Sequence, residues 1–92
     1  MVINSIRDEM EHGECRIVRA KSIMDGIASA GYDALCAILE LEFAHDGQVW
    51  RFYDVPEHVW YEWRRSEKTS VYFHTYISGR YVSRQIRAGS RQ

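Results

Sequence analysis

Apolar residues alternate with other residues over positions 35–43, which is the pattern of a strand with one buried face. The apolar positions are Leu35, Ala37, Leu39, Leu41 and Phe43. The intervening positions are Cys36, Ile38, Glu40 and Glu42. Asp46-Gly47 follows, a dipeptide typical of tight hairpin turns. The sequence therefore predicts a β-hairpin over about residues 35–54.

The register of this hairpin follows if Asp46 and Gly47 form a two-residue turn. The expected cross-strand pairs are then Phe43 with Trp50, Leu41 with Phe52, and Glu42 with Arg51. In that register Trp50 and Phe52 share the inner face with the leucines. Arg51 and Tyr53 lie beside the two glutamates on the other face, which we expect to be solvated.

A helix is expected directly after the hairpin, over about residues 55–65. Asp54 reads as its N-cap, with Pro56 in the first turn and Glu57 at the third helical position. An apolar stripe for the core is formed by Val59, Trp60 and Trp63.

The predicted fold class is α+β. It is a small antiparallel sheet, made of the hairpin over about 35–54 and a short N-terminal strand over 15–19, packed against one main helix over about 55–65. Residues 71–77 fit either a strand or a short helical turn, and a short C-terminal element follows them. We expect an acidic N-terminal extension at 1–14, one domain at 15–88, and a tail at 89–92.

The chain's 92 residues carry a formal net charge of -1, which argues against the overall basic surface of a duplex-DNA binder. Charge is nonetheless uneven. Residues 1–14 hold four acids and one base, whereas residues 79–92 hold four arginines and no acid. The uncharged apolar run over 34–39 is far shorter than the ~20 residues that cross a bilayer, so we expect no membrane association. Cys15 and Cys36, without an apolar leader, favour a reducing, cytoplasmic setting.

No catalytic or metal-binding motif is evident. The histidines His12, His45, His58 and His74 lie in unrelated local contexts. The segment from His12 to Cys15 lacks a second close ligand pair, as a zinc site would require. We therefore expect a protein that is not an enzyme and needs no cofactor and no metal.

The order and spacing of several short elements resemble the KTSC domain over about residues 17–86. These elements are Gly31-Tyr-Asp33, Leu39-Glu-Leu-Glu-Phe43, Gly47, Trp50-Arg-Phe-Tyr53, Val55-Pro56, Val59-Trp60, Tyr72-Phe73, Ile77 and Arg80-Tyr81. The family's central Tyr-x-Tyr would fall on Trp50 and Phe52. Its Gly before the Tyr-Phe pair would fall on Ser70, and its Asn after the pair on His74.

The resemblance implies a binding module for RNA or tRNA, because the domain occurs at the C-terminus of some lysyl-tRNA synthetases and in small bacterial and phage proteins. The sequence adds cations and rings of the types that bind single strands. The candidate binding residues are Arg64, Arg65, Lys68, Tyr72, Tyr76, Arg80, Tyr81 and Arg84. Arg64 and Arg65 are also explained by their place at a helix end, where cations favour the helix dipole.

A protein-protein interaction module is the alternative, for instance a phage or mobile-element protein that binds and inhibits a host protein, such as part of a defence system. Ile3, Ile6 and Met10 of the acidic extension, and the many Tyr, Trp and Arg residues, are the features that favour it. A homodimer through an exposed strand edge belongs to the same class.

Overall fold

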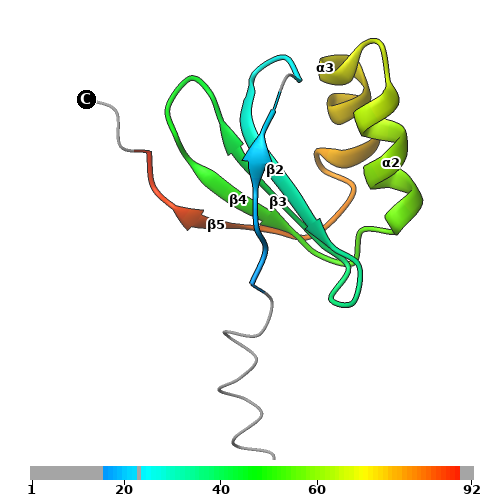
Figure 1. Cartoon of the computed structure of the whole chain (residues 1–92), viewed down its shortest axis with the longest axis horizontal. Helices are drawn as coiled ribbons and strands as arrows, with labels where there is room; N and C mark the ends of the chain where they lie inside the picture. Colours follow the sequence, from blue (N-terminus) through cyan, green and yellow to red (C-terminus); the bar gives the residue numbers. More distant parts are fainter. Residues whose placement is uncertain (1–15, 23, 90–92) are drawn as a thin grey trace, which may run out of the picture.

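The computed structural model describes residues 16–22 and 24–89, which form one antiparallel sheet with helices on one side (Figure 1). The five strands are β1 (Ala20–Lys21), β2 (Ile27–Asp33), β3 (Ile38–Phe43), β4 (Val49–Phe52) and β5 (Ser83–Arg87). They lie in the order β1-β2-β3-β4-β5. Each strand therefore pairs with its neighbour in the sequence, and β1 and β5 form the two edges.

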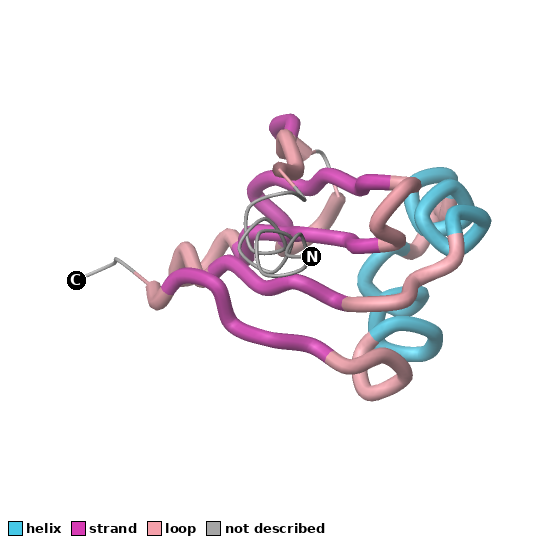
Figure 2. The backbone as a smooth tube through the Cα atoms, turned by 90° about the horizontal axis from the view of Figure 1, so that it is seen from below, coloured by secondary structure: helices cyan, strands magenta, loops and turns pink. Residues whose placement is uncertain are grey.

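The helical segments all lie between β4 and β5 in the sequence. They are α2 (Glu57–Arg65), α3 (Thr69–Tyr72) and the π-helical turn η1 (Phe73–Ile77). Figure 1 and Figure 2 show them together on the same side of the sheet. The predicted α+β class is confirmed, and the ambiguous segment 71–77 is helical. The short N-terminal strand is present as β1, but its expected bounds are wrong, because residues 16–19 precede the strand. Cys15 lies outside the described residues.

The hairpin is present, but its predicted register is wrong by two residues. The observed pairs are Leu39 with Phe52, Glu40 with Arg51, and Leu41 with Trp50. The turn is longer than expected and spans residues 44–47, with the Gly47 amide donating to the Phe43 carbonyl (2.9 Å). Gly47 adopts a φ of 78°, which glycine tolerates without steric cost. A shift of two residues keeps every side chain on its expected face.

The first part of the predicted strand is a turn instead. The Asp33 carboxylate accepts hydrogen bonds from the amides of Leu35 (2.9 Å) and Cys36 (3.2 Å), which bends the chain over residues 34–37. Leu35 is consequently 96% exposed rather than part of the core. Cys36 is disulfide-bonded, which disagrees with the reducing setting that the sequence favoured, because disulfides persist in oxidising environments. The cytoplasmic location stays a prediction.

Asp54 does not cap α2, contrary to the prediction. Its φ of 57° places it in the left-handed region, where it turns the chain out of β4. Pro56 is the N-cap residue and makes no side-chain cap hydrogen bond. The helix entrance is instead fixed by Val55, whose amide donates to the Ala37 carbonyl (2.9 Å) and whose side chain is fully buried.

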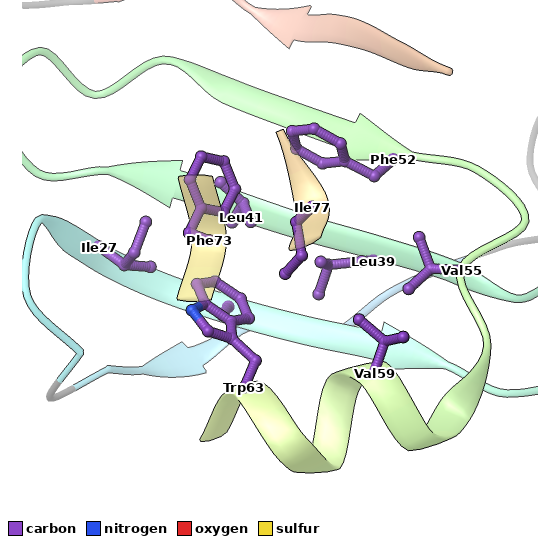
Figure 3. Packing of buried hydrophobic residues seen from close by; sticks show 10 residues of the cluster. Ile27, Leu39, Leu41, Phe52, Val55, Val59, Trp63, Phe73 and Ile77 are labelled. Atoms are coloured by element: carbon purple, nitrogen blue, oxygen red, sulfur yellow. The ribbon is translucent and has the colours of Figure 1, made fainter. Parts of the chain in front are cut away.

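The hydrophobic core lies between the sheet and the helical segments (Figure 3). The helices contribute Val59 and Trp63 from α2, and Phe73 and Ile77 from η1. The sheet contributes Ile27, Ala30, Leu39, Leu41 and Phe52. Trp63 is fully buried, and its indole N–H donates to the Thr69 carbonyl (3.0 Å), so its one polar group is satisfied. Trp60, expected in the core, is only half-buried.

The other face of the sheet is not the solvated surface that the sequence pattern indicated. Glu40 is 7% exposed, and its carboxylate pairs with Arg51 (2.8 Å) and with Arg19 (3.3 Å). Arg19 precedes β1, so the segment entering the sheet brings the second cation across this face. A carboxylate with two cationic partners is tolerated in a site with little water.

No helix within the described part of the chain is long and apolar enough to cross a membrane. The expected extension at residues 1–14 and the adjacent Cys15 lie outside the described residues.

Candidate ligand-binding groove

A groove of about 790 Å³ lies between the β1 edge of the sheet and α2. The N-terminal segment and β1–β2 contribute Val18, Ala20, Lys21, Ser22, Met24, Ala30, Gly31 and Tyr32; α2 contributes Trp60, Tyr61, Arg64 and Arg65. These residues include three aromatic rings and three cations, and no carboxylate. The groove is thus suited to a flat or apolar group that carries negative charge.

Two stacked rings build one wall of the groove. The rings of Tyr32 on β2 and Trp60 on α2 are 5.9 Å apart and inclined by 19°. The Tyr32 hydroxyl donates to the Val55 carbonyl, which fixes the ring against the start of the helix. Burial, and then the nearby Glu57 carboxylate, raise the pKa of Tyr32, so it stays neutral at physiological pH. The pair offers a rigid aromatic surface.

The cations of the groove come mainly from the last turn of α2. The Arg64 guanidinium lies 4.9 Å from the centre of the Trp60 ring and 6.0 Å from that of Tyr61, in cation-π contact. Among the described residues, no carboxylate lies within ion-pair distance of Arg64, Arg65 or Lys21. Their hydrogen-bond donors are therefore available to an anionic ligand.

Small residues of β2 line part of the groove. Ala30 and Gly31 of β2 line it where the chain before β1 crosses the sheet. A Cβ at Gly31 would lie 2.3 Å from the Val18 carbonyl oxygen, so no larger residue fits without moving this segment. Close backbone approach, rather than an unusual φ, accounts for this glycine.

Three of the predicted binding tyrosines gather elsewhere, on the other side of α2. The rings of Tyr72 and Tyr76 are 4.7 Å apart, and Tyr81 is close enough to Tyr72 to influence its ionisation. The Tyr72 hydroxyl donates to the Glu62 carboxylate (3.0 Å). Helical spacing places Glu62 across the buried stripe of α2 from Trp60 and Arg64. An acidic residue at this cluster disfavours contact with phosphates.

The Tyr72–Glu62 contact makes a testable prediction about alkaline stability. Burial, and then the hydrogen bond to Glu62, raise the pKa of Tyr72 to about 12, above its ordinary value of 10.0. The raised pKa stabilises the fold fully below pH 10, and this contribution is lost as the pH rises toward 12. In urea unfolding between these pH values, we expect Tyr72→Phe to lose less stability than the wild type. Tyr76→Phe, at an exposed ring, is the control; an equal decline in all three proteins would contradict the assignment.

The remaining predicted residues are dispersed. Lys68 is exposed in the connection between α2 and α3. The Arg80 guanidinium donates to the Thr75 carbonyl (3.2 Å). Arg84 lies on β5, at the opposite edge of the sheet from β1. Of the eight residues that the sequence indicated, only Arg64 and Arg65 line the groove.

Sequence reasoning missed Lys21, Tyr32 and Trp60 as groove residues. Tyr32 was not assigned to a strand, because β2 has the sequence Ile-Ala-Ser-Ala-Gly-Tyr-Asp, and small residues are a weak signal for strands. Trp60 was assigned wholly to the core. Arg64 follows Trp60 by four residues, and side chains at that spacing meet on a helix surface. This spacing was the sequence signal that Trp60 lies beside a cation.

Two of three comparisons place the chain among known proteins. The model of the KTSC domain matches residues 25–81. The chain belongs to the KTSC family. The matched segment is shorter than the expected resemblance over 17–86. It contains the groove residues Tyr32, Trp60, Arg64 and Arg65. Lys21 and all of β5 lie outside the matched segment.

A crystal structure of a KTSC domain protein from Yersinia pestis has the same fold. It superposes with a TM-score of 0.71 at 25% sequence identity, covering 77% of this chain and 99% of the Yersinia chain. No curated protein matches this KTSC chain. Within the described residues, no group of three or more His, Cys, Asp or Glu side chains is placed to hold a metal ion.

Proposed function

We propose that this KTSC protein binds single-stranded nucleic acid, with RNA as the preferred ligand, in the groove between β1–β2 and α2. The observation that carries the proposal is the stacked Tyr32–Trp60 pair flanked by Arg64, Arg65 and Lys21. Bases stack on aromatic rings irrespective of sequence, and cations follow the phosphate backbone. Both requirements meet in one groove without a carboxylate.

The small overall charge of the chain is compatible with this proposal. A formal charge of -1 gives no long-range attraction to a polyanion, so the groove itself has to supply the positive potential. The arginines at the end of α2 do so at a site that also presents rings. The ligand is therefore expected to be short and unpaired, because a duplex shields its bases from stacking.

Binding is tested by fluorescence anisotropy of a labelled single-stranded RNA of mixed sequence, titrated with the protein at several salt concentrations. We expect affinity to fall as salt rises, because bound phosphates release counterions. The double variant Arg64→Ala and Arg65→Ala should bind roughly tenfold or more weakly, with a salt slope reduced by about one for each phosphate that the variant no longer binds.

The matched control is Arg80→Ala with Arg84→Ala, which removes the same charge from the chain at positions outside the groove. We expect this control to retain affinity, although the sequence alone placed Arg80 and Arg84 in the binding surface. Thermal unfolding of both double variants checks that the fold is intact. An equal loss of RNA affinity in the two double variants would show that net charge alone matters. A loss of affinity in the control variant alone would mean that RNA binds near Arg80 and Arg84 and not in the groove.

A protein-binding role is the second candidate, and the exposed edge of β5 favours it. The apolar residues that the sequence analysis placed in an interface, Ile3, Ile6 and Met10, lie outside the described residues. Inhibition of a host or defence protein remains one form of this alternative.

A further inference from the structure

The strand β5 offers a free edge at the side of the sheet opposite the groove. Among the described residues it pairs with β4 alone, and all of its residues, Ser83–Arg87, are exposed. The other edge strand, β1, has only two residues. Natural proteins usually shorten or cover such an edge, because its unpaired backbone groups accept another strand.

The backbone hydrogen bonds show which groups point outward. The Val82 carbonyl accepts from the Tyr53 amide (2.9 Å), so Val82 faces β4. Backbone groups alternate along an antiparallel strand, and Ser83 lies opposite Phe52 as the next pair. The amide and carbonyl groups of Ser83 and Gln85 therefore point away from β4, ready to pair with an added strand.

The outer face of β5 is positively charged. Arg84 lies opposite Arg51, and no carboxylate of the described residues is within ion-pair distance of Arg84. Arg87 contacts the Glu42 carboxylate at 3.3 Å and remains half-exposed. The sequence contains no acid after Glu67. A second copy paired edge to edge would bring like charges together, which is destabilising, whereas an acidic strand would be attracted.

The inner face of the same edge adjoins a second groove of about 360 Å³. Next to β5 its lining is aromatic and small, with Phe43, Trp50, Phe52, Phe73, Ser78, Gly79 and Ser83. The polar residues His45, Asp46 and Gln48, in and after the β3–β4 turn, line the rest. Because Ser83 is small, an apolar side chain of an added strand opposite it can reach the groove. A strand added beside β5 would therefore need side chains of two kinds in alternation, apolar on the inner face and acidic on the outer face.

We propose that the β5 edge binds an extended segment of a partner protein in which acidic and apolar residues alternate, added to the sheet as a sixth strand. The apolar residues lie opposite Ser83 and Gln85 and face the groove beside Phe52 and Trp50. The acidic residues lie on the face of Arg84. Such strand addition takes affinity from the main chain and specificity from the alternate side chains. This interface is separate from the nucleic-acid groove and does not depend on it.

The test uses the full chain and a short fluorescein-labelled peptide in which glutamate and valine alternate. Gln85→Pro removes the outward amide but none of the bonds to β4, since proline is tolerated at a free edge. Its matched control is Gln85→Ala, which keeps the amide. We expect Gln85→Pro to weaken peptide binding about tenfold, Gln85→Ala to leave it near the wild-type value, and Arg84→Ala to weaken it as well. A peptide with lysine in place of glutamate should not bind.

Circular dichroism of each variant checks folding, and a two-dimensional amide spectrum of the wild type should show shifts at Ser83 and Gln85 on peptide addition. Three results would overturn the proposal. The first is equal binding by Gln85→Pro and the wild type. The second is a self-association in sedimentation that Gln85→Pro abolishes, which would assign the edge to a second copy. The third is binding of single-stranded RNA that depends on Arg84 but not on the Gln85 amide, with no binding of the peptide.

Discussion

Replacing Trp63 by alanine is expected to lower the free energy of unfolding by about 3–5 kcal/mol, the range for a large aromatic residue removed from a core. Trp63 is fully buried and joins α2 to η1 in the core: its ring centroid lies 5.7 Å from that of Phe73 of η1 and 6.3 Å from that of Trp60 of α2. The substitution also leaves the Thr69 carbonyl without its indole donor. Because small domains have a total stability of about 5–15 kcal/mol, a loss of this size removes a large part of the free energy of unfolding.

Urea unfolding followed by far-ultraviolet circular dichroism measures the effect. Trp60→Ala is the matched control, since it removes the same side chain from the same helix at a half-buried position. We expect a clearly smaller loss there, because less apolar surface is returned to water. Equal losses for the two variants would contradict the division of the tryptophans between core and groove wall.

Neutralising Glu40 is expected to have the second largest effect. Glu40→Gln keeps the shape of the side chain but removes the charge that balances Arg19 and Arg51. The side chains of this cluster are only 10%, 21% and 20% exposed, in the order Glu40, Arg19, Arg51. Removing one partner of a poorly solvated ion pair leaves the other charge uncompensated. We expect a loss of about 2–3 kcal/mol in the free energy of unfolding, somewhat below the full range for buried pairs because of this exposure.

Glu42→Gln is the control for this prediction. Glu42 is two residues along the same strand and pairs with Arg87, but these side chains are 27% and 51% exposed. Water and salt screen such a pair, so its neutralisation should cost less than about 1 kcal/mol. A loss at Glu42 as large as that at Glu40 would mean that the outer face of the sheet does not hold a buried charge cluster.

The sequence predicted those parts of the fold that depend on local patterns. The alternation from Leu39 to Phe43 and the Gly47 turn placed the hairpin, and the spacing of Val59 and Trp63 placed the helix that covers it. The turn length was the error, because Asp46-Gly47 fits more than one loop and the pairing of β3 with β4 decides between them. A register shift of two residues left the faces unchanged, so this error moved no residue into or out of the predicted core. Leu35 is exposed for a different reason, because residues 34–37 form a turn.

Features that depend on distant segments could not be predicted. Glu40 looked solvated because nothing near it in the sequence indicates that Arg19 crosses the same face. Asp54 resembled a helix cap, but the chain needs a left-handed residue there to leave β4. In the groove, Arg64 and Arg65 were among the cations that the sequence indicated, and they lie in the last turn of α2. Tyr32 was missed because the small residues of β2 give little strand signal. Lys21 was missed because it lies on β1, beyond the segment 15–19 where the first strand was expected.

The most direct test of the nucleic-acid proposal follows the indole N–H signals of the chain's three tryptophans in a nuclear magnetic resonance titration with single-stranded RNA at low salt. Trp60 lines the groove, Trp63 is fully buried, and Trp50 lies by β5 with its indole donating to the Gln48 side chain (2.9 Å). We expect the Trp60 signal to shift progressively while the other two stay in place. A shift of Trp50 with Trp60 unmoved, or no shift of any indole as RNA is added, would contradict the account.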